Sequence, residues 1–287
     1  MSIPIIFLHR TDDDYLSFTL RQAKLASPES EVVLIGNASN SKYASMDVRH
    51  AMIEHYHSGA TEFASVYKHM SPCEYVYNLF CFQRWFILRD YLRQNNLSQC
   101  WTLDTDVMLY ANLNREEFKK FSGEFTWTTF MSLQELEELC SVTINYFKNP
   151  RLFEELKTFT KDTGNYIQEN GMLALSDMVT QRLHLEKYLK RDRIHGIIGS
   201  SFFDNNLYFS FPGVEILENR KKLYLINGYL HCRKENSTEF FKVNSVHFTT
   251  TANKKYIPYF YGPSLTQLTN GTFYFDYSSC RWIPTRV

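Results

Sequence analysis

The strongest strand pattern in the chain is Trp101-Thr102-Leu103-Asp104-Thr105-Asp106-Val107-Met108-Leu109, and we expect the strand to run over residues 100–110. Residues two apart on a strand share a face, so the pattern places Asp104 and Asp106 side by side. Two carboxylates on a buried strand cost too much free energy unless a cation lies beside them. The stretch therefore predicts a hard divalent ion, Mn²⁺ or Mg²⁺, held by oxygen ligands. The alternative is a pair of acids at a strand end, in water, without a function.

The residues before this stretch alternate between strand and helix patterns. A continuous apolar run at 3–9 is typical of a strand buried on both faces. A helix is expected at 15–26 and a second buried strand at 31–35, and this βαβ order implies parallel strands with a right-handed crossover. A long, largely apolar helix is expected over 74–95. The intervening residues are assigned a short helix near 45–53 and a strand near 61–67.

The residues after this stretch carry a mixed pattern. Ser132 and Glu135 form a capping box, which predicts a helix from there to about Lys148. Further helices are expected at 151–160 and 177–190, and further strands at 124–130, 223–229 and 243–248. The order of elements therefore predicts one α/β domain with a mostly parallel central sheet flanked by helices and a mixed C-terminal extension packed on it.

Composition narrows the classes of function. The 287 residues carry 31 basic and 31 acidic side chains, and a neutral chain argues against a protein that mainly coats nucleic acid or an anionic membrane. The six cysteines form no C-x-x-C pair, which disfavours a zinc or redox site and is typical of reduced thiols. No apolar run reaches ~18 residues, so no transmembrane segment is expected. The apolar run at the N-terminus is too short for a signal peptide, and we expect a cytoplasmic protein.

Several nucleotide- and phosphate-handling classes lack their motif here. The chain has no G-x-G-x-x-G and no G-x-x-x-x-G-K-S/T, which disfavours a dinucleotide oxidoreductase and a P-loop NTPase. A sugar nucleotidyltransferase would need a Gly-rich basic loop after the first strand. A haloacid-dehalogenase-type phosphatase would carry its Asp-x-Asp on the first strand and an acidic pair downstream. Neither pattern is found.

Two separate segments resemble the glycogenin-like glycosyltransferases of the GT-A-type superfamily. Phe82-Gln83-Arg84-Trp85 followed by Leu103-Asp104-Thr105-Asp106-Val107 is similar to their Arg-containing helix and D-x-D strand. Val246-His247-Phe248 with Lys254-Lys255 looks like their C-terminal His-Phe…Lys segment. The likeness covers about residues 3–110 and 243–256, and the usual Gly-x-Lys-Pro-Trp ending is absent. The resemblance is therefore to the superfamily rather than to the family.

The resemblance implies a fold, an activity and substrates. It implies a GT-A, Rossmann-like fold whose nucleotide-sugar-binding half spans residues 1–130 and whose acceptor half and C-terminal extension span residues 131–287. It implies metal-dependent transfer of a sugar from a nucleotide-diphosphate donor, a UDP-sugar, to a hydroxyl acceptor on a glycan or other molecule. A non-catalytic domain that binds a sugar nucleotide or glycan on the same fold is the alternative.

The resemblance also implies roles at the metal and the diphosphate. Asp104 would hold the metal and the ribose, Asp106 would hold the metal and support catalysis, and His247 would complete the metal site. Lys254 and Lys255 would contact the diphosphate. The alternative for His247 is a hydrogen-bonded histidine in the core of the C-terminal extension.

Four other positions are candidate contacts. The loop His9-Arg10-Thr11 would hold the base and ribose, whereas Thr11 and the acids that follow it could instead cap the next helix. Arg84 lies on an apolar helix stripe, so it reaches out to solvent, pairs with an internal carboxylate (Asp104 or Asp106), or contacts the donor diphosphate. Asp177 resembles the base of inverting enzymes, which conflicts with the retention that a glycogenin-like enzyme implies; its alternative is an ordinary acid at a helix N-terminus. Asn170-Gly171-Met172 could lie under the donor sugar.

Overall fold

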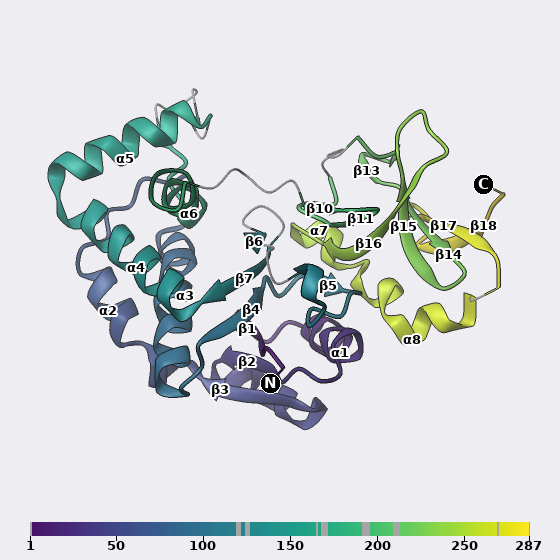
Figure 1. Cartoon of the computed structure of the whole chain (residues 1–287), viewed down its shortest axis with the longest axis horizontal. Helices are drawn as coiled ribbons and strands as arrows, with labels where there is room; N and C mark the ends of the chain where they lie inside the picture. Colours follow the sequence, from purple (N-terminus) through teal and green to yellow (C-terminus); the bar gives the residue numbers. More distant parts are fainter. Residues whose placement is uncertain are drawn as a thin grey trace. The chain divides into compact units, whose positions relative to one another are not determined.

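The computed structural model describes residues 2–118, 122–123, 127–164, 166–167, 172–190, 196–208, 213–268 and 270–286. The chain divides into two compact units, each built from separate stretches of sequence (Figure 1). The first unit comprises Met1–Ala51, Trp101–Phe130 and Ile194–Val287, and the second comprises Met52–Cys100 and Met131–Arg193. The expected division of one domain into halves at residue 130 stays a prediction.

A six-stranded sheet is the base of the first unit. Its order is β3-β2-β1-β4-β7-β6, and β1 pairs in parallel with both β2 and β4. These strands are β1 (Ile5–His9), β2 (Val32–Gly36), β3 (Val48–Met52), β4 (Gln99–Leu103), β6 (Ser122–Gly123) and β7 (Thr128–Ser132). All five residues of β2 are buried, as the continuous apolar run requires. Helix α1 (Leu16–Ala26) connects β1 to β2, and the predicted α/β class with a parallel-rich sheet is confirmed.

The strand order places a topological switch point beside β1. Strand β2, which follows β1 through α1, lies on one side of β1, and β4 lies on the other. In open α/β sheets a crevice forms outside the carboxyl ends of the strands at such a point, and ligands bind there. The residues that leave β1 and β4 at this edge are His9 and Asp104.

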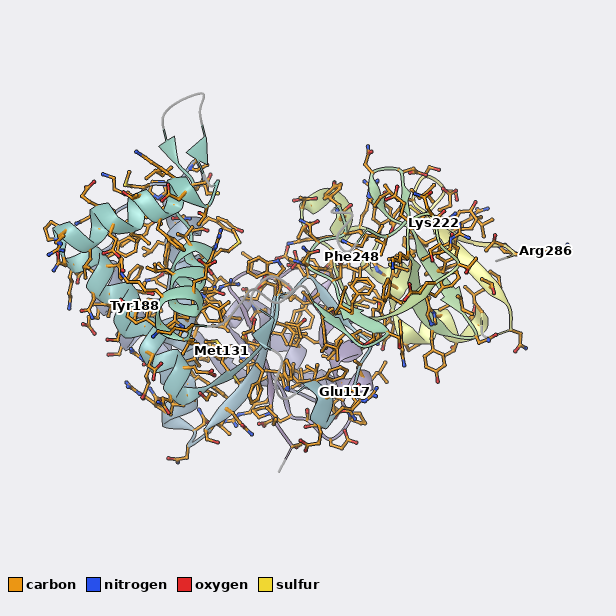
Figure 2. The ribbon with its side chains drawn as sticks, turned by 45° about the horizontal axis from the view of Figure 1, so that its top comes forward. Glu117, Met131, Tyr188, Lys222, Phe248 and Arg286 are labelled. Atoms are coloured by element: carbon orange, nitrogen blue, oxygen red, sulfur yellow. The ribbon has the colours of Figure 1, made fainter. Side chains whose placement is uncertain are left out.

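The C-terminal residues of the first unit form a second sheet. Its order is β10-β11-β16-β15-β14-β17-β18, and β5 pairs with β16. The strands are β5 (Val107–Leu109), β10 (Ile197–Ile198), β11 (Ser201–Phe203), β14 (Leu223–Ile226), β15 (Tyr229–Arg233), β16 (Phe240–His247), β17 (Thr272–Asp276) and β18 (Arg281–Pro284). A separate hairpin joins β12 (Ile216–Leu217) to β13 (Arg220–Lys221), and the short helices α7 (Thr251–Lys254) and α8 (Gly262–Leu265) follow β16. Phe248, labelled in Figure 2, is fully buried in the apolar core of this part.

The second unit is mainly helical. Its helices are α2 (Ser58–Ala64), α3 (Tyr75–Gln94), α4 (Leu133–Lys148), α5 (Pro150–Asp162) and α6 (Asp177–Leu183), with short strands β8 (Tyr166–Ile167) and β9 (Met172–Leu173). The predicted capping box of Ser132 and Glu135 is present at the start of α4. Phe63 stacks on Phe86 with ring centroids 5.0 Å apart and meets Phe147 edge-on at 5.1 Å, so much of the aromatic content of this unit fills its core. No helix of the described ranges combines the length and apolar character needed to cross a membrane.

Outside the stretch at 100–110, three expected elements were wrong: the helix near 45–53, the strand near 61–67 and the strand at 223–229. The region 45–64 is strand then helix, not helix then strand, because Val48 and Ala51 are buried as part of β3 while Phe63 packs against α3. The expected strand at 223–229 is a hairpin, since Asn227 and Gly228 adopt positive φ and form the tight turn between β14 and β15. The helix expected over 177–190 is present as α6, which ends at Leu183 and continues as a π-helical turn, His184–Tyr188.

Candidate metal and nucleotide site

The two aspartates lie in a turn rather than on one strand. The expected strand over residues 100–110 is wrong: β4 ends at Leu103, and β5 begins at Val107 in the other sheet. The backbone N–H of Val107 donates to the Asp104 carbonyl at 3.0 Å and closes the turn. Asp104 and Asp106 are therefore brought together by a chain reversal, and not by the two-residue repeat of a strand.

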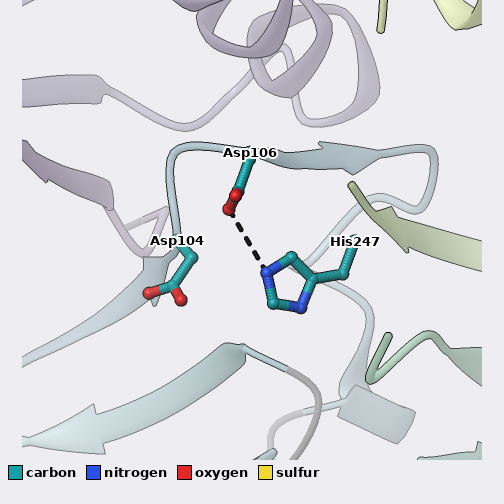
Figure 3. Close-up of side chains that lie close together, drawn as sticks. All are labelled: Asp104, Asp106 and His247. Carbon is teal, nitrogen blue, oxygen red and sulfur yellow. Dashed lines mark ion pairs between the residues drawn. The ribbon is translucent and has the colours of Figure 1, made fainter. Parts of the chain in front are cut away.

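His247 joins these acids through strand pairing. Strand β16 is antiparallel to β5, with His247 opposite Val107, the residue after Asp106. The imidazole Nε2 lies 3.2 Å from Asp106 Oδ1, and Phe248 N–H donates to the Asp106 carbonyl at 3.0 Å. One ligand atom from each of Asp104, Asp106 and His247 lies within 4.8 Å of the others (Figure 3). The expected approach of His247 to both acids is present, and its binding of a metal stays a prediction.

The partners of His247 fix which nitrogen faces the acids. Nδ1 lies 2.9 Å from the Asn205 carbonyl oxygen, which only accepts, so Nδ1 carries a hydrogen and donates it. This bond leaves Nε2 directed at Asp106. Metal-binding histidines are usually held in this way, with the second ring nitrogen bonded to a carbonyl or carboxylate.

Two basic side chains, His247 and Lys254, lie beside Asp106. Burial alone would raise the pKa of Asp106, but the hydrogen bonds and charges of His247 and Lys254 lower it to about 2. Burial would lower the pKa of His247, and its bond to Asp106 and the charges of both acids raise it instead. Lys254 Nζ lies 3.2 Å from Asp106 Oδ2 and donates to the Tyr15 hydroxyl at 3.4 Å. The site is therefore arranged for positive charge beside a fixed carboxylate.

The two lysines predicted for the diphosphate differ in position. Lys254, at the end of α7, contacts the acidic turn and lies 4.8 Å from the centroid of the Tyr15 ring. Lys255 is exposed and lies 4.9 Å from the centroid of the Tyr256 ring. The structure brings Lys254 to the acids and gives Lys255 a different neighbour.

The loop that leaves β1 is bonded to the acidic turn. His9 Nδ1 lies 3.1 Å from the hydroxyl of Thr105, and His9 Nε2 lies 2.5 Å from Asp13 Oδ2. The Thr11 hydroxyl also donates to Asp13 Oδ2, at 2.7 Å. The Arg10 carbonyl accepts from Asn37 Nδ2 at 2.9 Å. Helix α1 begins after Tyr15 with no side-chain cap, so these acids bind the loop rather than cap the helix as the alternative proposed.

Arg84 and Asp177 pair with each other inside the second unit. Arg84 Nη2 lies 2.7 Å from Asp177 Oδ2, which also accepts from Trp85 Nε1 at 2.9 Å and Gln181 Nε2 at 3.2 Å. Arg84 therefore has a carboxylate partner in its own unit, and a pair with Asp104 or Asp106 stays a prediction. The Asp177 side chain is 5% exposed and accepts from three side chains, which is the arrangement of a buried counter-ion; its role as a base stays a prediction. Asn170 and Gly171 lie outside the described residues, and Met172 begins β9.

Sequence reasoning missed several residues that complete the site. Thr105 and Tyr15 connect the β1 loop, the acidic turn and Lys254. Thr105 could have been found from its place between the two acids. Asn205 contributes only its backbone carbonyl to His247, so no residue type in the sequence marks it.

Comparisons with known proteins found likenesses among solved structures alone. No family model matches the sequence, and no curated protein matches it. Among solved structures, the chain is similar to mouse xyloside xylosyltransferase 1 in its apo form, with 10% identity, TM-score 0.44, and 68% of this chain and 85% of that chain covered. It is also similar to the PaToxG glycosyltransferase, with 10% identity, TM-score 0.37, and coverage of 65% and 70%. A third likeness is to an active site mutant of LgtC, with 11% identity, TM-score 0.33, and coverage of 63% and 70%.

Proposed function

We propose that this chain is a metal-dependent glycosyltransferase that moves a sugar from a nucleotide-diphosphate donor, a UDP-sugar, to a hydroxyl acceptor on a glycan or other molecule. The observation that carries the proposal is the cluster of Asp104, Asp106 and His247, whose ligand atoms lie within 4.8 Å of one another. The cluster lies at the carboxyl edge of β4, beside the switch point of the parallel sheet. A diphosphate-binding site is expected at that edge.

The donor set suits Mn²⁺ or Mg²⁺. Two carboxylates provide the oxygen ligands that hard divalent cations prefer, and an imidazole is acceptable to Mn²⁺. The bond from His247 Nδ1 to Asn205 directs Nε2 toward the acids, as a nitrogen ligand requires. We therefore assign Asp104, Asp106 and His247 as the residues that hold the metal. When bound, the ion would supply positive charge to the leaving diphosphate.

The other residues of the first unit would bind and orient the donor. Lys254 now pairs with Asp106. With a metal ion neutralising that carboxylate, the Lys254 ammonium group would be available to donate to a diphosphate oxygen, a role that lysine often has. His9, Arg10 and Thr11 line the loop at the end of β1 and would contact the base and ribose, with Asp104 also reaching the ribose. Lys255 would contact the diphosphate only after moving from the Tyr256 ring.

Of the two site residues predicted in the second unit, Arg84 is part of this proposal and Asp177 is not. Arg84 is retained as a candidate donor contact that would have to share its guanidinium with Asp177. Asp177 is bonded to three side chains, and we do not assign it as the base. The expected cytoplasmic location is part of the proposal.

Calorimetry tests the proposal directly. UDP would be titrated into the protein with Mn²⁺, and again after the metal is removed with EDTA. We expect binding only with Mn²⁺, and slow release of UDP from UDP-sugars in the presence of the metal. Equal affinity with and without metal would exclude the metal role. Metal-dependent binding without any turnover of UDP-hexoses would favour a non-catalytic sugar-nucleotide-binding domain.

A further inference from the structure

A buried ion pair, Lys221 with Asp204, is bonded to the backbone of His247. Lys221 Nζ is 2.9 Å from Asp204 Oδ1, and the two side chains are 1% and 2% exposed. Removing both charges from water costs several kcal/mol per ion in a protein interior, and an apolar pair of similar size often costs less. Stability alone does not explain why the chain has this ion pair. The contacts of the other Asp204 oxygen, Oδ2, indicate what the pair does.

Asp204 connects this pair to the backbone of the predicted metal ligand. Asp204 Oδ2 accepts the backbone N–H of His247 at 3.0 Å. The residue after Asp204 is Asn205, whose carbonyl accepts the Nδ1 hydrogen of His247 at 2.9 Å. Lys221 Nζ also donates to the carbonyl of Asn206, and Leu207 N–H donates to the His247 carbonyl at 3.2 Å. The segment 204–207 thus bonds to both the backbone and the ring of His247. Lys221 in turn bonds to Asp204 and to the Asn206 carbonyl, and so holds the segment in place.

Arg220, the neighbour of Lys221 on the same strand, bonds to the residue immediately before Lys254. Arg220 Nε donates to Asn253 Oδ1 at 2.8 Å, and Asn253 is fully buried immediately before Lys254. The Arg220 guanidinium lies within 5.5 Å of the ring centroids of three tyrosines, Tyr208, Tyr256 and Tyr277, so its position is set by packing as well as by hydrogen bonds. Adjacent residues on a strand point to opposite faces, and β13 therefore contacts both segments at once.

We propose that β13 is the positioning element of the C-terminal half of the site: Lys221, through Asp204 and Asn205, sets the ring of His247, and Arg220, through Asn253, sets Lys254. Neither Lys221 nor Arg220 is a predicted metal ligand. Each acts through the residues that it holds in place. This inference rests on the proposed function for its consequence, but the orientation of His247 is a property of the metal-free chain.

The first test removes the pair without leaving a single buried charge. The variant Lys221→Met/Asp204→Asn deletes both charges and keeps a side-chain oxygen at residue 204. We expect it to fold and to weaken Mn²⁺ binding about tenfold, within the 10- to 100-fold range found when outer-shell partners of a metal ligand are changed. Mn²⁺ binding is measured by electron paramagnetic resonance of the free ion. Lys234→Met/Glu239→Gln removes an exposed pair of the same type and should leave Mn²⁺ affinity unchanged.

The second test separates the two contacts of β13. Arg220→Met should weaken UDP binding in saturating Mn²⁺ severalfold, while its affinity for Mn²⁺ alone should be equal to or higher than that of the wild type, because a displaced Lys254 competes less for Asp106. The Lys221→Met/Asp204→Asn variant should do the reverse, with its main effect on Mn²⁺. If both variants change both affinities equally, or neither changes either, β13 does not position these residues.

A third measurement uses the wild-type chain and does not depend on a variant that folds. The ¹⁵N shifts of His247 in the metal-free protein should show Nδ1 protonated, and the Nδ1 proton should be slow to exchange. A His247 ring without a proton on Nδ1 would overturn the inference. Failure of the wild type to bind Mn²⁺ would instead overturn the proposed function, and the His247 spectrum would still decide whether Asn205 sets the ring.

Discussion

Replacing Lys254 with Met should have opposite effects on metal and on donor binding. In the metal-free chain, Lys254 Nζ lies 3.2 Å from Asp106 Oδ2, so a divalent ion that binds Asp106 must displace this ammonium group. The Lys254 side chain is 31% exposed and the Asp106 side chain 14% exposed, which places the pair at the upper end of the range for partly solvated ion pairs, about 1 kcal/mol. Deleting a competitor of that strength corresponds to roughly fivefold tighter Mn²⁺ binding, since 1.4 kcal/mol is tenfold.

The donor should respond in the other direction. With Mn²⁺ bound, Lys254 is expected to contact the diphosphate, and the Met side chain provides no such bond. We therefore expect Lys254→Met to bind UDP more weakly in saturating Mn²⁺, by about 1.5–3 kcal/mol for a charge-assisted hydrogen bond. Mn²⁺ affinity is measured by electron paramagnetic resonance and UDP affinity by calorimetry, with Lys234→Met as an exposed control. Unchanged or weaker Mn²⁺ binding by Lys254→Met would refute the competition between the ammonium group and the ion.

Three further substitutions test other parts of the structure. Asp106→Asn should abolish donor turnover and Mn²⁺ binding while the far-ultraviolet circular dichroism spectrum stays native, because it removes a ligand charge from a surface turn. Arg84→Ala should lower the free energy of unfolding by about 3 kcal/mol in urea titrations, since it leaves the buried Asp177 without its charged partner, and Arg84→Lys should lose less. Ser132→Ala should cost about 1 kcal/mol of unfolding free energy, because it deletes the hydroxyl that accepts from Glu135 N–H at the start of α4.

Each of these results has a contrary outcome. Full turnover by Asp106→Asn at low Mn²⁺ would show that the acids serve only the turn. An Arg84→Ala variant as stable as the wild type, but with weaker UDP binding, would show that Arg84 is a donor contact rather than a structural partner of Asp177.

For the helix cap, Gln134→Ala changes a residue of the same turn that is not part of the capping box. A similar loss of stability there would show that the cap is not the cause.

The sequence predicted the elements that depend on local patterns. The buried runs at β1 and β2, the long helix α3 and the capping box of α4 all follow from apolar periodicity or from two residues at a fixed spacing. The meeting of Asp106 and His247 was predicted only because the motifs resemble a known superfamily. Neither periodicity nor spacing relates residues that are joined by the pairing of β5 with β16.

What the sequence did not predict depends on tertiary contacts. The residues before Asp104 and after Asp106 do form strands, β4 and β5, but these belong to different sheets. An alternating pattern continues unchanged when a chain passes from one sheet to another, so the sequence could not show the break. The partner of Arg84 lies 93 residues away in α6, so neighbours on its own helix could show that it needs a counter-ion but not which one. The support of His247 by Asn205 uses a backbone carbonyl, which every residue type carries.

The pairing of β5 with β16 also bears on how the protein is made. Lys254 bonds to Tyr15, 239 residues earlier in the chain, and the predicted metal ligands come from β16 and from the turn before β5. Contacts over such separations form late, because a long loop must close before they contribute any free energy. During synthesis, the first strands and helices can fold while residue 247 has not yet left the ribosome. A nascent or truncated chain would therefore hold the two acids without their third ligand, and retention on a Mn²⁺ column would distinguish chains completed beyond residue 254 from shorter ones.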